Sequence, residues 1–326
     1  MVIGITAGDS SGIGPEVLLK AYMRREIEHP VVVFGDLDVL AYYNEALGYA
    51  APLRRASCAD ACVEGYLNVV DAGILSREEL TVGRVNAKSG RAAREYVVTA
   101  TRAALAGRIA ALVTLPMNKE ATQLSDPGFV GHTELIGGLC GVSDVTIMLV
   151  SGQLIVTHVS THVSLAGAIE RVRQERIHTI IRLTWEALQK IRENPRIAVA
   201  GLNPHAGENG LFGDQEAAEI RPAIERARGE GIPVDGPFPP DTIFYMAVRQ
   251  RKFDAVVCMY HDQGHIPLKL LDFEGGVNVA LGLPIVRTSV DHGTAFDIAG
   301  QGVASTTSFI HALRLAAHLA PKLVSG

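Results

Sequence analysis

Seven of the eleven histidines occupy short polar segments that directly follow apolar runs of the sequence. An isolated histidine is usually a hydrogen-bonded structural residue, but a cluster with glycines and carboxylates beside it suits metal binding or catalysis. The seven are His132, His158, His162, His205, His261, His265 and His292.

Three of these polar segments each supply an imidazole after a strand-like run: Val156–Val163, Gly201–Glu208 and Met259–His265. In an α/β protein such segments would meet at one edge of the sheet. One imidazole from each segment could then bind a divalent metal and leave coordination positions open for a substrate. Structural hydrogen bonding is the alternative role, because spacing in the sequence does not establish that the segments converge.

Two further segments carry cationic or hydroxyl side chains that suit an anion. Pro116–Glu120 includes Lys119, and Gly131–Glu134 includes His132 and Thr133 at the expected start of a helix. The residues Lys269, Asn278 and Arg287 follow at intervals of nine. Cationic side chains and helix N-termini both bind anions. For each lysine taken singly, a solvated basic surface is the alternative.

A glycine-rich loop, Ala7–Glu16, follows the first apolar run. It contains Gly-x-Gly but not the full Gly-x-Gly-x-x-Gly pattern, because Pro15 and Glu16 follow, so it is weak evidence for dinucleotide binding. Its backbone N–H groups could face an anion. For the loop taken alone, we favour the alternative interpretation of a tight strand-to-helix turn.

Short apolar runs alternate with helix-period segments along the chain, which indicates an α/β fold with mostly parallel strands and helices on both faces. The expected strands are Val2–Thr6, Val31–Phe34, Leu67–Val70, Ile109–Thr114, Val145–Val150, Leu154–His158, Arg196–Ala200 and Ala255–Met259. The expected helices are Pro15–Tyr22, Ser89–Ala106, Leu165–Arg192, Asp214–Arg228 and Ser305–Leu319. The segment Gly282–Thr294 is too polar after Arg287 to be predicted as an ordinary core strand.

The composition is that of a globular enzyme, with 48% hydrophobic and 20% charged residues. A net charge of −5 argues against a nucleic-acid binder. The most apolar stretch, Ala103–Met117, contains Arg108 and is too short to span a bilayer. There is no secretory signal pattern and no Cys-x-x-Cys pair. We therefore expect a cytoplasmic enzyme with reduced thiols that contacts neither nucleic acid nor membrane.

Taken together, the motifs resemble those of the 4-hydroxythreonine-4-phosphate dehydrogenase (PdxA) family of vitamin B6 biosynthesis. The similarity extends from Ile5 to about Ala304. Its segments are Gly8-Asp9 with Gly12–Glu16, Pro116–Glu120, Gly131–Glu134, Thr161-His162, Asn203–Glu208, Gly236-Pro237 with Asp241–Phe244, Met259–Gly264 and Gly276–Asp297. The occurrence of so many motifs in one order makes the resemblance specific.

The resemblance implies an isopropylmalate-dehydrogenase-like α/β fold, with two α/β lobes and a cleft between them. The first lobe would comprise residues 1–135 and 276–326. The second lobe, residues 136–275, would carry the metal ligands and the dimer contacts. The resemblance also implies a homodimer whose active site takes residues from both subunits.

The same motif match assigns roles to individual residues. The metal ligands would be His162, His205 and His261. The substrate would be bound by His132, Thr133, Lys269, Asn278 and Arg287. Three neutral imidazoles favour zinc, with cobalt, nickel, magnesium and manganese as alternatives. The redox cofactor would be NAD, with NADP as the alternative, and the resemblance does not identify the residues that contact it.

The implied reaction is the oxidation and decarboxylation of a phosphorylated C4 hydroxy acid. Asp241, Asp262 and Lys269 are the candidate general bases, and the sequence does not choose among them. The segments Asn209–Asp214, His158–His162, Gly264–Lys269 and Ala295–Ala299 are similar to the branch that oxidises D-threonate or D-erythronate 4-phosphate. The first alternative is the 4-phosphohydroxy-L-threonine dehydrogenase of pyridoxal phosphate synthesis. Two more are a cis-dihydrodiol carboxylate dehydrogenase on the same scaffold and a non-catalytic small-molecule binding protein.

Two motifs depart from the family pattern. One is the last motif, where Val303 stands in place of a common lysine, and the other is the glycine-rich loop. The family loop reads Gly-Asp-Pro-Ala-Gly-Ile-Gly-Pro-Glu, whereas Ser10 and Ser11 replace Pro-Ala in this chain. We expect this change to loosen the turn while keeping Asp9 and the glycines. It bears on fine substrate or cofactor preference and leaves the reaction class unchanged.

Overall fold

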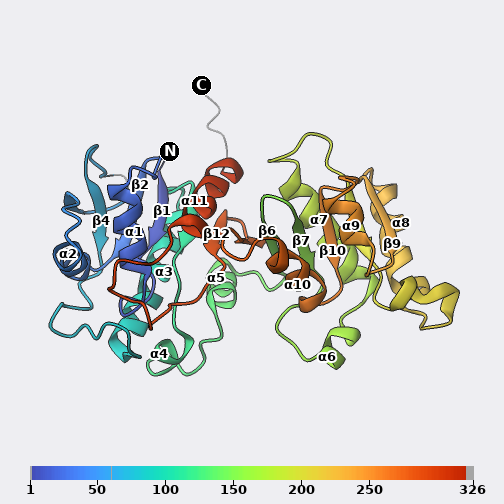
Figure 1. The fold of residues 1–326 in the computed structure, drawn as a ribbon, viewed down its shortest axis with the longest axis horizontal. Helices are drawn as coiled ribbons and strands as arrows, with labels where there is room; N and C mark the ends of the chain where they lie inside the picture. Colours follow the sequence, from blue (N-terminus) through green and yellow to red (C-terminus); the bar gives the residue numbers. More distant parts are fainter. Residues whose placement is uncertain (1, 60, 321–326) are drawn as a thin grey trace. The chain divides into compact units, whose positions relative to one another are not determined.

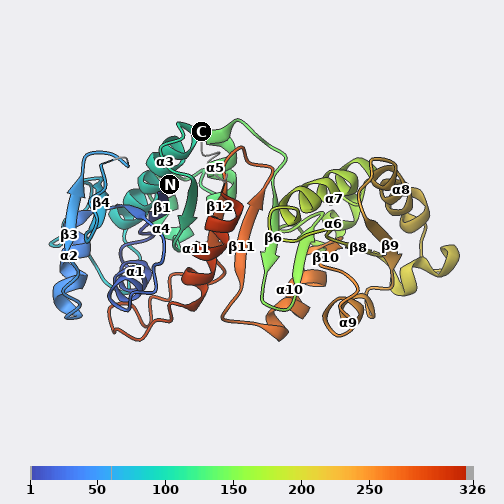
Figure 2. The same ribbon diagram turned by 90° about the horizontal axis from the view of Figure 1, so that it is seen from above.

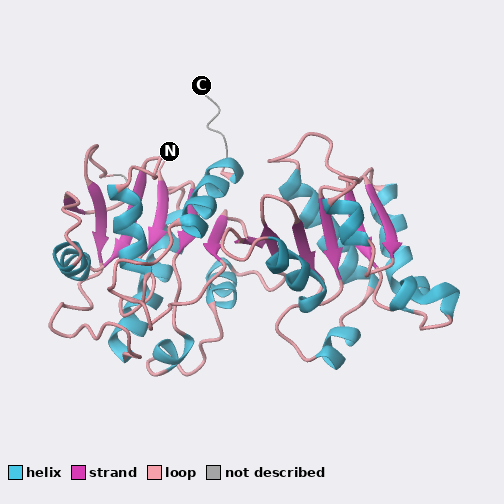
Figure 3. Cartoon of the chain, viewed as in Figure 1, coloured by secondary structure: helices cyan, strands magenta, loops and turns pink. Residues whose placement is uncertain are grey.

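The computed structural model describes residues 2–59 and 61–320. The chain divides into two compact units, which we call unit 1 (Met1–Ser143 with Leu283–Gly326) and unit 2 (Asp144–Gly282). In each unit helices flank a set of strands (Figure 1, Figure 3). The lobe boundary expected after residue 135 falls inside a helix, α5 (His132–Cys140).

The strands of unit 1 are all parallel to their neighbours. Their order is β3 (Leu53–Ala56), β4 (Leu67–Asp71), β2 (Val31–Gly35), β1 (Ile3–Thr6), β5 (Ala111–Thr114) and β12 (Arg287–Val290). The central strands β1 and β5 are buried along their whole length, and their other residues besides Val, Ile and Leu are Gly, Ala and Thr. Such continuous apolar runs are expected when helices cover both faces of a parallel sheet.

Figure 2 shows the helices of unit 1 on both sides of its strands, with α3 on one side and α1 and α11 on the other. The helices are α1 (Gly14–Met23), α2 (Leu37–Ala46), α3 (Ala87–Leu105), α4 (Lys119–Gln123), α5 (His132–Cys140) and α11 (Thr307–Leu319). Asn86 caps α3 by accepting hydrogen bonds from the N–H groups of Lys88 and Ser89. Helix α5 ends at Gly141, whose φ of 69° is the left-handed conformation that glycine adopts readily.

The strands of unit 2 are mixed in direction. Their order is β11 (Val277–Leu281), β6 (Thr146–Val150), β7 (Ile155–His158), β10 (Ala255–Cys258), β8 (Ile197–Ala200) and β9 (Val234–Phe238). Strand β6 is antiparallel to β11 and β7, whereas β7, β10, β8 and β9 pair in parallel. The unit therefore contains four parallel strands whose carboxyl ends lie at one edge.

The helices of unit 2 also lie on both sides of its strands, with α7 on one side and α9 and α10 on the other (Figure 2). They are α6 (Leu165–Glu170), α7 (Gln174–Leu188), α8 (Arg221–Gly229), α9 (Ile243–Val248) and α10 (His261–Leu271). Two irregular helical segments precede α8, a 3-10 segment η1 (Pro204–Gly210) and a π-helix η2 (Glu216–Ile220). Within the described part of the chain, no helix has the length and apolar character that crossing a bilayer would require.

The predicted α/β class with mostly parallel strands is confirmed, and each of the eight predicted strands corresponds to an observed one. The prediction of a single helix from Leu165 to Arg192 is wrong. The chain breaks between α6 and α7, where Val172 is buried and Arg173 is extended with φ −130°. The break leaves the N–H of Gln174 at the start of α7, where it donates to Glu219 at 2.7 Å.

The expectation that the segment after Arg287 is too polar for a core strand is also wrong. Strand β12 is buried at all four positions. Two of its polar side chains are hydrogen-bonded: Arg287 donates to the Thr114 hydroxyl, and the Thr288 hydroxyl donates to the Ala312 carbonyl at 2.9 Å. Polar residues can occupy a buried strand when each finds a partner in this way.

The prediction did not include β3, β9 or β11. Of these, β3 and β9 differ in composition from central strands and are terminal in the order of their units. Strand β3 contains two arginines, and β9 contains Gly236 and Pro237. Edge strands tolerate charged residues and proline because one side of the backbone has no strand partner. The apolar signal that marks central strands is therefore absent from both.

Two helical glycines give a matched test of packing in unit 1. A Cβ at Gly90 in α3 would collide with the backbone of Ala121 in α4, whereas a Cβ at Gly138 in α5 would meet nothing within 4 Å. We expect Gly90→Ala to destabilise the protein by about 1–3 kcal/mol through overpacking. Gly138→Ala should stabilise it by about 0.5–1 kcal/mol through helix propensity. Urea unfolding of both variants measures this, and equal midpoints would contradict the close approach of α3 and α4.

Candidate functional site

The three histidine-bearing segments of unit 2 leave the carboxyl ends of adjacent parallel strands. His158 ends β7, Gly201 follows β8, and His261 begins the helix after β10, and β10 pairs with both β7 and β8. The three segments therefore start from one edge of the strands, as ligand-binding segments of α/β proteins do.

Four imidazoles gather at this edge. The rings of His261 and His265 are stacked, with centroids 3.6 Å apart and planes 11° apart. The His162 ring lies 5.7 Å from the His261 ring, and the His158 ring lies 4.6 Å from the His265 ring. The two predicted metal ligands His162 and His261 are thus neighbours.

Burial keeps the two inner imidazoles neutral. Together with a smaller contribution from neighbouring histidines, it lowers the pKa of His158 to about 3 and the pKa of His265 to about 4. His265 Nδ1 lies 3.2 Å from His158 Nε2 and 3.0 Å from the His261 carbonyl oxygen. We infer that Nδ1 of His265 carries the proton, because the carbonyl can only accept. Sequence reasoning assigned no role to this buried pair.

The third predicted ligand, His205, lies in a left-handed turn on η1. His205, Ala206, Gly207, Glu208 and Asn209 all have positive φ, between 42° and 81°. This conformation costs non-glycine residues about 1–2 kcal/mol each. The ring contact of His205 is with Phe212, at 6.3 Å between centroids.

The metal site therefore stays a prediction. Among residues 2–59 and 61–320, no three His, Cys, Asp or Glu side chains lie close enough together to hold a metal ion. The donor chemistry nevertheless fits a borderline divalent cation, since the proposed ligands are all imidazoles. One chain brings His162 and His261 together and carries His205 on a separate loop.

The three candidate bases differ in their surroundings. Lys269 lies on α10 at a spacing of four from His265 and eight from His261, so the three share a helix face. The Asp262 carboxylate lies 2.6 Å from His261 Nδ1. Asp241 is exposed in the turn before α9. Lys269 is therefore near the imidazole cluster by its position on α10, and Asp262 is near it by its contact with His261.

Unit 1 contains a buried cation with a neutral partner. Arg287 is 3% exposed, and its Nε and Nη2 both donate to the Thr114 hydroxyl, at 3.2 and 2.7 Å. Burial lowers the pKa of Arg287 to about 10, and the charge of Glu134 opposes this. The guanidinium is thus still charged at neutral pH. Burying a charge whose hydrogen-bond acceptor is neutral is costly, so this arrangement suits an anionic ligand.

His132 lies close enough to Arg287 to be affected by its charge. Burial lowers the pKa of His132 well below its ordinary value, and the charges of Arg287 and Lys119 lower it further. Its Nε2 atom is buried and has no hydrogen-bond partner among the described residues. In unit 2, the buried Oδ1 of Asn278 also has no such partner. Two of the predicted substrate-binding residues therefore carry an unsatisfied polar atom, which native proteins rarely leave unexplained. Thr133 is the second residue of α5, next to His132.

The glycine-rich loop is a buried turn, as we favoured for it alone. The expectation that Ser10 and Ser11 loosen it relative to Pro-Ala stays a prediction. Ser11 Oγ hydrogen-bonds Ser89 Oγ at 2.8 Å, and Ser10 Oγ lies 3.4 Å from the Tyr96 hydroxyl. Both partners belong to α3, so the serines tie the turn to that helix. Asp9 in this loop is fully buried, and its Oδ2 has no partner among the described residues.

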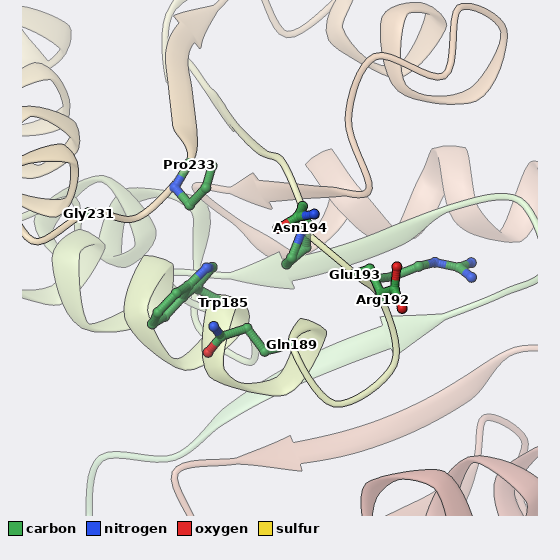
Figure 4. Close-up of a pocket in the computed structure, with 8 residues that line it drawn as sticks. Trp185, Gln189, Arg192, Glu193, Asn194, Gly231 and Pro233 are labelled. Atoms are coloured by element: carbon green, nitrogen blue, oxygen red, sulfur yellow. The ribbon is translucent and has the colours of Figure 1, made fainter.

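A surface depression in unit 2 lies at the other end of the strands. Figure 4 shows Trp185, Gln189, Arg192 and Asn194 lining it, together with Pro233. Pro233 directly precedes β9 and Pro195 lies two residues before β8, so the depression lies at the amino ends of these strands. Ligands of open α/β sheets bind at the carboxyl ends, which disfavours this depression as the active site.

Comparison with known proteins gives one family. A model of the family described as pyridoxal phosphate biosynthetic protein PdxA matches residues 26–316. The chain is 46% identical to a 4-hydroxythreonine-4-phosphate dehydrogenase of Beijerinckia indica, over 96% of this chain and 94% of the relative. It is 44% identical to a D-threonate 4-phosphate dehydrogenase of Cupriavidus necator, over 98% of both chains. These relatives are dehydrogenases, and the chain is an oxidoreductase.

Solved structures agree with this assignment. A 4-hydroxythreonine-4-phosphate dehydrogenase from Klebsiella pneumoniae matches with a TM-score of 0.86 and 42% identity, over 98% of this chain and 99% of that one. A beta-decarboxylating dehydrogenase from Thermococcus kodakarensis is 14% identical, with a TM-score of 0.51 over 98% of this chain and 83% of that one, and shows the fold alone. The fold is the isopropylmalate-dehydrogenase-like α/β fold that we expected.

The buried Asp9 carboxyl predicts a measurable pH dependence of stability. Burial raises the pKa of Asp9 from 3.8 to about 6, so the folded state binds this proton more tightly than the unfolded state. Stability is therefore lost as pH rises from about 4 through 6, by up to about 3 kcal/mol. We expect the free energy of unfolding of Asp9→Asn, relative to wild type, to increase over this range. Urea unfolding at several pH values measures it.

The control is Asp38→Asn. The backbone N–H of Arg77 lowers the pKa of the exposed Asp38, with its side chain adding to the effect, so this variant should lose stability relative to wild type as pH rises. Parallel curves for Asp9→Asn and wild type would contradict the burial of an uncompensated Asp9 carboxyl.

Proposed function

Because the chain belongs to the PdxA family, we propose that it is an NAD-dependent dehydrogenase that oxidises and decarboxylates a phosphorylated C4 hydroxy acid. The substrate we favour is D-threonate 4-phosphate or D-erythronate 4-phosphate. The relative from Cupriavidus necator bears the first of these activities in its name. NADP is the alternative cofactor, and we expect the enzyme to be cytoplasmic.

The observation that carries the proposal is the buried Arg287. Its guanidinium donates to a neutral hydroxyl and lies near His132, whose Nε2 lacks a partner among the described residues. A phosphate or carboxylate would supply the negative charge and the acceptor atoms that these groups lack. We propose that Arg287, His132 and Thr133 bind one anionic group of the substrate, and that Lys269 and Asn278 are also substrate-binding residues.

We further propose that His162, His205 and His261 hold a divalent metal, with zinc the first choice and cobalt, nickel, magnesium or manganese as alternatives. When bound, such a cation acts as a Lewis acid that lowers the pKa of a hydroxyl and favours an enolate. The Asp262 carboxylate beside His261 Nδ1 would keep the proton on that nitrogen and leave Nε2 as the donor atom. The complete site would be shared between the subunits of a homodimer, which would supply His205 from a different chain than His162 and His261.

The reaction removes a hydride from the carbon beta to the carboxylate and a proton from its hydroxyl. Asp262 is engaged with His261 and Asp241 is exposed at the turn before α9. We therefore propose Lys269 as the base, because it shares the α10 face of His261 and His265. The β-keto acid that results loses CO2, and the carbon next to the former carboxylate regains a proton. NAD supplies the hydride acceptor.

A second substrate has specific support. The relative from Beijerinckia indica is named for 4-hydroxythreonine 4-phosphate and is as similar as the D-threonate enzymes. That substrate carries an ammonium next to the carboxylate, where D-threonate 4-phosphate carries a hydroxyl. An imidazole is neutral or cationic, so neither His158 nor His265 offers an anionic partner to an ammonium. This favours the hydroxyl.

Metal removal tests the imidazole assignment. We expect thorough chelation to abolish NADH formation and added zinc or cobalt to restore it. His205→Ala should lower metal affinity by more than about 100-fold and remove activity with the metal. The measurements are metal content and NADH absorbance, with His318→Ala as a control because His318 is exposed on α11. Full activity in the chelated enzyme would rule out a metal-dependent reaction.

Substrate preference tests the proposed branch. We expect kcat/KM to be higher for D-threonate and D-erythronate 4-phosphate than for 4-phosphohydroxy-L-threonine, by as much as roughly 10⁴-fold, because burying an unpaired ammonium is costly. The products from the D-sugar-acid phosphates should be dihydroxyacetone phosphate and CO2. Assays of all three substrates at saturating NAD and metal measure this. A clear preference for the amino acid would assign the chain to vitamin B6 synthesis.

A further inference from the structure

We propose that Glu216 is the positioning residue that holds the loop carrying His205, and that it thereby sets the affinity of the proposed metal site. The inference rests on the proposed function in one respect, namely that His205 is a metal ligand. Glu216 begins the π-helix η2 and acts on the loop without being a proposed ligand itself.

The Glu216 carboxylate binds the start of the loop with both oxygens. Oε1 accepts hydrogen bonds from the backbone N–H groups of Leu202 and Asn203, each at 2.8 Å. Oε2 accepts one from Asn203 Nδ2 at 2.9 Å. Glu216 is 3% exposed, so these charge-assisted bonds are shielded from water. A single side chain therefore fixes the two residues that lead into the loop.

Glycines on either side of His205 make room for this carboxylate. A Cβ at Gly201 would lie 3.1 Å from Glu216 Oε1, and a Cβ at Gly207 would lie 2.8 Å from Glu216 Oε2. Gly207 also has φ +81°, which other residues rarely adopt. The backbone before and after His205 thus closes around Glu216.

The loop needs such a restraint because its own conformation is unfavourable. His205, Ala206, Glu208 and Asn209 have left-handed backbone angles that non-glycine residues avoid. Conformations of this kind persist when surrounding contacts over-determine them, and they concentrate at functional sites. Glu216 is the residue that contacts the loop both before His205, at Leu202 and Asn203, and after it, close to Gly207.

The same π-helix supplies a matched control. Glu219 accepts hydrogen bonds from the N–H of Gln174 at 2.7 Å and from Arg173 Nη1 at 3.0 Å, and so contacts the start of α7 instead of the His205 loop. Glu219→Gln removes a carboxylate from the same turn. It separates the effect of Glu216 on the loop from a general disturbance of η2.

The first experiment measures the dissociation constant for Co²⁺, with the full-length protein, in wild type, Glu216→Gln, Glu219→Gln and His205→Ala. Glu216→Gln should weaken binding by roughly 10–100-fold, as loss of a partner behind a metal ligand does. Glu219→Gln should leave it unchanged, and urea midpoints confirm that every variant is folded under the assay conditions. If His205→Ala weakens binding and Glu216→Gln does not, the positioning role is refuted. If His205→Ala has no effect, the proposed metal site fails instead.

The second experiment does not depend on metal. Hydrogen exchange at the amides of Leu202 and Asn203 should be faster in Glu216→Gln than in wild type and unchanged in Glu219→Gln. The double variant Asn203→Asp with Glu216→Gln reverses donor and acceptor across the side-chain hydrogen bond, so it should recover part of both the protection and the Co²⁺ affinity. Wild-type exchange in Glu216→Gln, or no recovery in the double variant, would overturn the proposal.

Discussion

The parallel pairing of β7, β10 and β8 is the constraint on which the histidine-rich edge of unit 2 depends. Because the strands share a direction, the segments that follow them leave the same edge. Gln263 joins two of these segments: its Oε1 accepts from the Met259 N–H at 2.6 Å, and its Nε2 donates to the Gly201 carbonyl at 2.8 Å. A Cβ at Gly264 would lie 2.6 Å from His158 Nε2, so glycine lets α10 approach β7. The shared strand direction places the histidine-bearing segments at one edge. Gln263 connects two of these segments, and Gly264 allows α10 to lie close to β7.

Unit 1 differs from unit 2 in burying a cationic side chain that stays charged, Arg287. In unit 2, His158 and His265 avoid the cost of a buried charge by staying neutral, and their rings lie beside the ring of His261, a proposed metal ligand. In unit 1, Arg287 remains charged and donates to Thr114, which brings no negative charge. The free energy cost of that burial falls when an anion binds. The proposed metal and the proposed anion therefore each match the unit assigned to them.

The sequence predicts the interior of this fold better than its edges and its loops. Central strands are continuous apolar runs, so each predicted strand was found, whereas β3 and β9 escape detection because edge strands carry Arg55 or Pro237. The helix predicted from Leu165 fails because Glu219, distant in sequence, stabilises the break at Arg173. Arg287 shows the same limit for the candidate site. Its segment is polar in sequence, but it forms a buried strand because the Thr114 hydroxyl accepts a hydrogen bond from Arg287. These features depend on contacts between residues that are distant in the sequence, which local sequence patterns do not reveal.

His205 is the residue for which local sequence says least about conformation. Asn209 and Gly207 tolerate positive φ, but His205, Ala206 and Glu208 have no preference for it, so local propensity does not specify the turn. The conformation must come from packing against η2. In this π-helical turn, Glu216 accepts a hydrogen bond from the loop and Glu219 accepts one from the start of α7. A π-helix exposes side chains at angles that an α-helix does not, and such turns are frequent at functional sites. Two carboxylates three residues apart can thus serve two different elements, so the orientation of His205 depends on the packing of α7 and α8 around η2.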